Sequence, residues 1–265
     1  MSQQLPPNFM PWNPEEIKPV QKRRLKPGAK AVFICLLVIL LAAVFLYGGL
    51  FRVRTVTVVG LQGSGKEEMV MESAGITRGM SYFSVTEKSV QQKMAQNHYL
   101  KYRGMEKFLP GTVVLYVEER VARANVHVMG VTFLMDENGM VLERLTGGLR
   151  DDLPVASGLQ ARDVTVGKTI ASGTEDQLTA YCLLMDELLH QGYLHNISEL
   201  KVSDTESIYL LTRDGYTVHL GDTSSLRAKI GTVRAVVQEL KNRGLEGGVL
   251  EASVPAQATY TPNAL

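Results

Sequence analysis

The chain has 265 residues, of which 45% are apolar and 21% are charged, the composition of a folded protein of one or two ordinary domains. The formal net charge of +1 hides an uneven distribution, because residues 1–30 carry six of the 28 basic groups and only two of the 27 acidic groups. The part that follows residue 51 is therefore slightly acidic, with a net charge of −3. Such a surface lacks the clustered Lys and Arg that neutralise phosphates, so nucleic-acid binding is excluded as a main function.

A run of 21 residues without a single charge extends from Ala31 to Phe51. As a helix with a rise of about 1.5 Å per residue it would be roughly 31 Å long, enough to cross the hydrocarbon core of a bilayer. The run lacks the amphipathic stripe expected of a buried core helix. It is also longer than the apolar region of a signal peptide, and it lacks a small-x-small cleavage site. Because basic residues precede it, the positive-inside rule favours a cytoplasmic N-terminus. We expect a single-pass anchor in the lipid bilayer, with the rest of the chain outside the cytoplasm.

The first 30 residues contain six prolines and few apolar groups, so we expect a basic tail without a core. Whether Trp12 in this tail docks a partner stays open. Of the two cysteines, Cys35 lies in the apolar run and only Cys182 follows it, so no disulfide can form within the outer part. An exterior domain with so few cysteines is more typical of a prokaryotic cell-surface protein than of a small secreted eukaryotic scaffold, which disulfides would usually stabilise.

The segment 52–119 has the pattern of a small β-α-α-β-β domain. Alternating Val and Thr residues up to Gly60 predict a strand, and Pro110-Gly111 predicts the turn between two later strands. Gly75 predicts the end of the first helix, and Thr86 predicts the N-cap of the second. In chain order, the expected elements are a strand at 53–59, helices at 67–74 and 86–97, and strands at 99–108 and 112–118.

The segment 120–255 is predicted to be a mostly β domain with two helices, followed by a polar tail at 256–265. Together with the preceding domain this gives an α+β ectodomain on an N-terminal transmembrane helix. Apolar residues recur every three or four positions in the two helical stretches, and dense turn signals separate the strands. The expected helices cover 175–191 and 226–242, and the expected strands cover 121–128, 131–135, 140–145, 198–202, 208–212, 216–220 and 249–254.

Residues 60–66 match the phosphate-binding template GxxxxGK, and they lie between an expected strand and an expected helix. The next residue is Glu67, where a Ser or Thr would be needed to ligate Mg²⁺. A location outside the membrane would also remove the supply of nucleotide. We therefore interpret this stretch as a glycine turn, and we expect Lys66→Ala and Glu67→Ala to leave function intact.

No other motif assembles a catalytic or metal site. Ser198 and Lys201 have the Ser-x-x-Lys spacing of penicillin-binding proteins, but the companion Ser-Asp-Asn and Lys-Thr-Gly motifs are missing. The neighbouring acids Glu118-Glu119 and Asp151-Asp152 would point to opposite faces of a strand. The histidines show no zinc-ligand spacing. We expect no catalytic residue, no metal, no cofactor and no small-molecule substrate; the histidines are His98, His127, His190, His195 and His219.

Four stretches of the outer part resemble motifs of the bacterial FtsQ/DivIB family of cell-division proteins, and they occur in the family's order behind an anchor. The run 53–60 resembles its V-x-x-I-x-V-x-G motif, and 74–83 resembles its helix-end step with Ser81 in place of an asparagine. The run 109–120 resembles its P-x-T-x-x-I-x-V-x-E-R motif, although Ala122 replaces the proline that follows. The run 134–139 resembles its L-I-D-x-x-G hairpin.

The resemblance implies a non-enzymatic scaffold of the division septum, with a POTRA domain at 52–119 and a β domain at 120–255. Its partners would be FtsB/DivIC-like and FtsL-like membrane proteins, and it would support septal wall synthesis. Two alternatives stay open: a membrane-anchored cell-wall enzyme and a POTRA-bearing transport component.

The last expected strand is the predicted partner-binding site, because only a polar tail follows it and a terminal strand often lies at a sheet edge. An edge exposes unpaired N–H and C=O groups to which a partner strand can add. The resemblance implies the same region for the FtsB/DivIC-like partner. At such an edge, a proline at Ala252 should weaken partner capture while leaving most of the fold intact, because edge positions tolerate proline better than central ones. The predicted strand consists of Val249, Leu250, Glu251, Ala252, Ser253 and Val254.

Overall fold

The computed structural model describes residues 27–61, 65–161, 163–171 and 173–263, and the chain divides into two compact units, Met1–Leu50 and Phe51–Leu265. The first unit contains helix α1, Pro27–Leu50. Most of the expected tail, residues 1–26, lies outside the described residues, as do the side chains of 45–50 within the expected span. Among the residues that the structure describes, no helix is both long and apolar enough to span a bilayer. The transmembrane anchor therefore stays a prediction.

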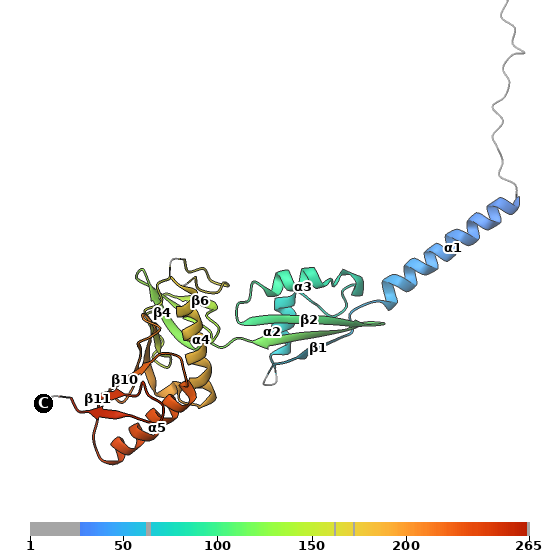
Figure 1. The fold of residues 1–265 in the computed structure, drawn as a ribbon. Coiled ribbons are helices and arrows are strands. Elements are labelled where there is room, and N and C mark those ends of the chain that lie inside the picture. Colours follow the sequence, from blue (N-terminus) through green and yellow to red (C-terminus); the bar gives the residue numbers. More distant parts are fainter. Residues whose placement is uncertain (1–26, 62–64, 162, 172, 264–265) are drawn as a thin grey trace, which may run out of the picture. The chain divides into compact units, whose positions relative to one another are not determined.

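The second unit begins with the expected β-α-α-β-β order (Figure 1). The strands form a three-stranded sheet in the order β1-β3-β2, in which β1 is parallel to β3 and β2 is antiparallel to it. The Thr86 hydroxyl caps the second helix by accepting from Ser89 N–H at 3.3 Å, and Gly75 ends the first in the left-handed conformation. The elements are β1 (Thr55–Val59), α2 (Glu67–Ala74), the 3-10 turn η2 (Tyr82–Ser84), α3 (Glu87–Met94), β2 (Leu100–Phe108) and β3 (Thr112–Glu119).

Both helices cover one face of this small sheet. Residues alternate between buried and half-buried along β3, and Val113, Leu115 and Val117 are its inward side chains. Val70 of α2 and Met94 of α3 pack onto the same cluster with no exposed surface. The alternation along β3 and the four-residue spacing in the helices therefore account for a single shared core.

The rest of the unit is built on a nine-stranded sheet in the order β12-β11-β10-β9-β8-β7-β4-β5-β6. A helical crossover through the last helix makes β11 parallel to β10, as a connection between parallel strands requires. The elements are β4 (Ala124–Val128), β5 (Val131–Met135), β6 (Val141–Leu145), β7 (Val155–Ser157), α4 (Glu175–His190), η3 (Leu194–Asn196), β8 (Ile197–Lys201), β9 (Ile208–Thr212), β10 (Tyr216–Gly221), α5 (Leu226–Asn242), β11 (Gly248–Glu251) and β12 (Thr259–Thr261).

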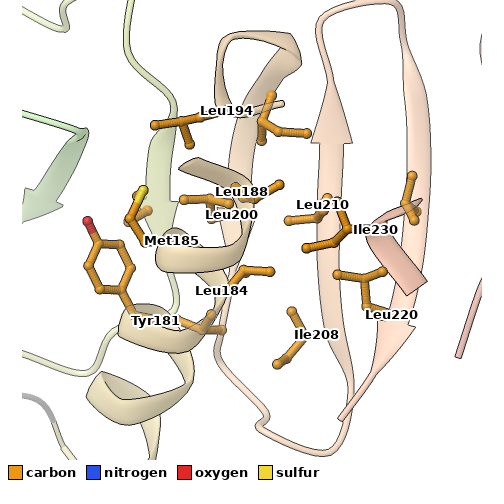
Figure 2. Packing of buried hydrophobic residues seen from close by; sticks show 14 of the residues in the cluster. Tyr181, Leu184, Met185, Leu188, Leu194, Leu200, Ile208, Leu210, Leu220 and Ile230 are labelled. Carbon is orange, nitrogen blue, oxygen red and sulfur yellow. The ribbon is translucent and has the colours of Figure 1, made fainter. Parts of the chain in front are cut away.

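One apolar core joins this sheet to its two helices. Figure 2 shows Leu184 and Leu188 of α4 facing Leu200 and Leu210 of the central strands, and Ile230 of α5 lies in the same cluster. All five side chains are fully buried. The predicted three- and four-residue spacing in both helices is confirmed, because the residues that carry it form this core.

Two strands were not expected from the sequence. The strand β7 lies between β4 and β8 and is only three residues long. The strand β12 lies in the segment that was expected to be a polar tail, and it pairs antiparallel with β11. The expectation that residues 249–254 form an uncovered edge is therefore wrong, because β12 lies outside β11 in the sheet.

Candidate partner-binding edge

The outer strand on the C-terminal side of the nine-stranded sheet is β12, and no described strand lies beyond it. It pairs with β11 through Val249 with Thr261, Leu250 with Tyr260 and Glu251 with Thr259. The backbone groups available to an added strand therefore belong to β12.

The structure separates the six predicted residues into core and surface positions. Leu250 and Ala252 are 0% and 1% exposed and belong to the main core, so their side chains cannot contact a partner. Val249 and Val254 are 45% and 51% exposed. Glu251 is exposed and Ser253 is half-buried. Only the surface positions can meet another protein through their side chains.

The hydrogen-bond pattern of β11 shows which groups of β12 point outward. Ala252 N–H donates to the His219 carbonyl of β10 at 2.9 Å. Backbone groups of successive strand residues point to opposite sides, so Glu251 and Val249 face β12 and bond Thr259 and Thr261. Tyr260 then directs its N–H and C=O away from β11. The pattern also corrects the expectation for Ala252: proline there would break a bond inside the sheet.

Packing against Gly247 and Gly248 holds β12 in place. The Tyr260 hydroxyl donates to the Gly247 carbonyl at 3.0 Å, and its ring meets that of Tyr216 at 6.5 Å. Gly248 has φ of +112°, and a Cβ there would lie 2.7 Å from both the Thr261 carbonyl oxygen and the Tyr260 ring. The close approach of β12 to β11 therefore requires glycine at this position.

Beside this edge, one face of the sheet carries a line of polar side chains that sequence reasoning missed. His219 pairs across the strands with Tyr209 and Glu251. Its Nδ1 lies 2.7 Å from Glu251 Oε2, its Nε2 lies 3.0 Å from Ser207 Oγ, and its ring stacks on Tyr209 at 4.5 Å. Partial burial opposes ionisation of Glu251, but hydrogen bonds from Ser253 and His219 outweigh it and hold the pKa below its usual value.

The lysine of the GxxxxGK stretch and the serine of the Ser-x-x-Lys stretch both contact groups elsewhere in the fold. Lys66 Nζ lies 2.6 Å from Glu119 Oε2, which joins the start of α2 to the end of β3. Residues 62–64 of the glycine-rich stretch lie outside the described residues. Ser198 donates to the Leu211 carbonyl at 3.1 Å, and it lies where the pairing of β8 with β9 is irregular, between Ile197 and Glu199.

The histidines and acids form no metal site in the described part of the chain, where no three His, Cys, Asp or Glu side chains gather closely enough to hold an ion. Glu118 and Asp152 form ion pairs with Arg103 and Arg150. Burial raises the pKa of the Cys182 thiol, which disfavours the reactive thiolate.

Comparison with known families assigns both parts of the second unit. Residues 51–120 match the family model described as POTRA domain, FtsQ-type, and residues 124–252 match the model described as cell division protein FtsQ/DivIB, C-terminal. The chain belongs to the FtsQ/DivIB family. This places it among the proteins of the bacterial division machinery, as the sequence motifs predicted.

Individual relatives agree with the family. The chain is 26% identical over 196 residues to the cell division protein FtsQ of Syntrophotalea carbinolica, which covers 73% of this chain and 67% of the relative. It is 22% identical over 222 residues to the cell division protein DivIB of Clostridium tetani, covering 83% of each. A solved extracytoplasmic domain of DivIB from Geobacillus stearothermophilus is 20% identical, with a TM-score of 0.32 over 47% of this chain and 97% of that domain.

Proposed function

We propose that this FtsQ/DivIB-family protein is a non-enzymatic scaffold of the division septum that captures FtsB/DivIC-like and FtsL-like membrane proteins and supports septal wall synthesis. The observation that carries this proposal is the outer strand β12, whose central residue Tyr260 directs its backbone groups away from the sheet. A partner strand that added there would gain main-chain hydrogen bonds, while neighbouring side chains would supply specificity.

The proposed topology places residues 1–30 in the cytoplasm, residues 31–51 in the membrane and residues 52–265 outside, enriched at the septum. It is supported by the uncharged run and by the basic residues before it. Protease added to protoplasts should remove residues 52–265 while the membrane stays sealed. Full protection of these residues would contradict the topology.

A matched pair of substitutions at Tyr260 tests the strand-addition proposal. Tyr260→Ala and Tyr260→Pro both remove the ring, but only the proline removes the outward N–H, and edge positions tolerate proline better than central positions. We expect Tyr260→Pro to capture less of the DivIC-like partner in a pull-down than Tyr260→Ala, with equal folding by circular dichroism. Equal capture by the two variants would place the interface elsewhere.

A second candidate function is hydrolysis, favoured by one observation. Ser207, His219 and Glu251 lie in the order of a nucleophile, a base and an orienting carboxylate, with contacts of 3.0 and 2.7 Å. Their alignment also follows directly from cross-strand pairing, which is the reason that we favour a structural role. A fluorophosphonate probe that labels the full chain and fails to label Ser207→Ala would establish a hydrolase. Absence of labelling, with normal septation in Ser207→Ala cells, would support the scaffold.

A further inference from the structure

The turn between β2 and β3 exposes two large apolar side chains that the proposed partner edge does not use. Phe108, the last residue of β2, is 51% exposed, and Leu109 beside it is 67% exposed. Single exposed apolar residues are ordinary, but adjacent ones at the tip of a hairpin give a small apolar projection.

This turn lies beside the residues with which the folded unit begins. Arg54 N–H donates to the Gly111 carbonyl at 2.8 Å, and the parallel pairing of β1 with β3 starts immediately after, at Thr55 and Thr112. A Cβ at Gly111 would clash with the Arg52 carbonyl oxygen, so the two backbones are in contact. The turn is therefore held about one strand spacing, roughly 5 Å, from the chain that leaves the uncharged run.

A third exposed apolar residue lies at the same end of the sheet. Phe83 of η2 is 42% exposed, and its ring meets that of Phe51 edge-on at 5.4 Å. Lys107 ties η2 to the end of β2, because its Nζ donates to the Tyr82 carbonyl at 2.7 Å and lies 4.3 Å from the centre of the Tyr82 ring. We refer to Phe83, Phe108 and Leu109 as the apolar tip.

Cations surround the apolar tip. The segments 51–55 and 106–112 contain Arg52, Arg54 and Lys107 but only one carboxylate, Glu106, whereas the part of the chain after residue 51 has a net charge of −3. Arg52 and Arg54 are exposed. Locally positive charge around apolar side chains is the combination that binds an anionic membrane surface, where apolar groups enter the interface and cations meet lipid phosphates.

We propose that the apolar tip inserts into the interface of the outer leaflet of the cell membrane, with Arg52 and Arg54 over the anionic headgroups, and so fixes the orientation of the POTRA domain on the bilayer. The inference rests on the proposed anchor. Phe51 ends the uncharged run and contacts Phe83, so an anchored run would hold the apolar tip at the membrane surface. The strand β2 ends at the tip, and its nine residues place its first residue, Leu100, about 27 Å from Phe108.

Depth-dependent quenching in vesicles tests the proposal on the full chain. In a background of Cys35→Ala and Cys182→Ala, the variant Leu109→Cys or Gln96→Cys carries the fluorophore NBD on its one cysteine. Gln96 is the matched control, because it is exposed and lies just before the start of β2, at the opposite end of the sheet. The protein is reconstituted into vesicles of phosphatidylethanolamine and phosphatidylglycerol with or without a doxyl-labelled lipid.

We expect the doxyl lipid to cause a large loss of fluorescence for the Leu109 probe and almost none for the Gln96 probe. Adding Phe108→Ser and Arg54→Gln should reduce the loss at Leu109, while circular dichroism stays unchanged. Replacing phosphatidylglycerol by neutral phosphatidylcholine should reduce it as well, because the cations then lose their partners.

Three results would overturn the proposal. Equal quenching of the two probes, while the chain stays in the vesicles after an alkaline wash, would refute the tip contact and leave the anchor intact. Release of the chain by that wash would refute the anchor, and the tip proposal with it. Protection of the Leu109 probe from aqueous iodide only after a partner protein is added would assign the tip to that protein instead of lipid.

Discussion

The ion pair between Arg120 and Asp136 gives the sharpest test of how the two folded parts of the second unit are joined. Arg120 follows the last residue of β3, and its guanidinium donates to Asp136 Oδ2 at 2.8 Å. The Asp136 side chain has no exposed surface, whereas that of Arg120 is 15% exposed. The perturbation is Arg120→Met, which keeps a long apolar stem and removes the charge.

The expected cost follows from what remains around Asp136. Its Oδ1 accepts from the N–H groups of Asn138 and Met140 at 2.9 and 2.8 Å, so the carboxylate keeps two of its three donors. Removing one partner of a buried ion pair costs about 3 to 5 kcal/mol, because the other charge stays buried without compensation. The partial exposure of Arg120 places the expected loss near the lower limit, about 3 kcal/mol.

Urea unfolding of residues 51–265, followed by circular dichroism, measures this loss. At an m value of about 2 kcal/mol per M, a loss of about 3 kcal/mol lowers the midpoint by about 1.5 M. The matched control is Arg243→Met, which breaks an exposed pair with Glu239 at the end of α5 and should change stability by less than about 1 kcal/mol. The double variant Arg120→Met, Asp136→Asn should recover part of the loss, because the neutral amide no longer leaves a buried charge.

The reasoning would be refuted if Arg120→Met lowered the midpoint no more than Arg243→Met. That result would mean that water or another cation compensates the Asp136 carboxylate. A double variant less stable than Arg120→Met alone would show that the charge of Asp136 is stabilised by its backbone donors without the arginine.

Three further predictions concern the β domain. Asn125→Ala should lower the free energy of unfolding by about 1 to 3 kcal/mol in urea titrations, because the buried amide donates to the Arg150 and Leu153 carbonyls at 2.9 and 3.1 Å. A hydrogen bond from Lys229 holds the pKa of Asp222 at about 2, below its ordinary 3.8. The stabilisation that the ionised Asp222 contributes is therefore complete above about pH 4 and is lost as the pH falls toward 2. The variant Lys229→Met should reduce the dependence of the urea midpoint on pH over that range. Gly248→Ala should displace β12 and reduce partner capture in the pull-down, with little change in far-ultraviolet circular dichroism, because only the three outermost strand residues move.

Much of the fold could be predicted because local patterns and tertiary packing agree. The alternation along β3 and the spacing of apolar residues in α4 are the same features that build the two cores. The helix caps could also be predicted, because Thr86 caps the N-terminus of α3 and Gly75 ends α2 in the left-handed conformation, as their chemistry favours. Such elements need no information about distant parts of the chain.

The missed features depend on residues far apart in the sequence. The strand β7 has only three residues, too few to show a period, and its pairing depends on both β4 and β8. The strand β12 is polar, and it is fixed by its contact with Gly248. The line from Ser207 to Glu251 depends on the register of three strands. No spacing within one segment predicts such a register.

The parallel pairing of β1 with β3 has a mechanical consequence. The folded unit begins at the start of β1, and β3 leads at its far end into the β domain through residues 120–123. If the start of β1 is held at a membrane while a bound partner pulls on the β domain, the force runs along the two strands in opposite directions. The pairs from Thr55 with Thr112 to Val59 with Tyr116 would then resist sliding together and would not separate one at a time. With its two ends held in this way, the POTRA domain would carry tension through all five pairs at once.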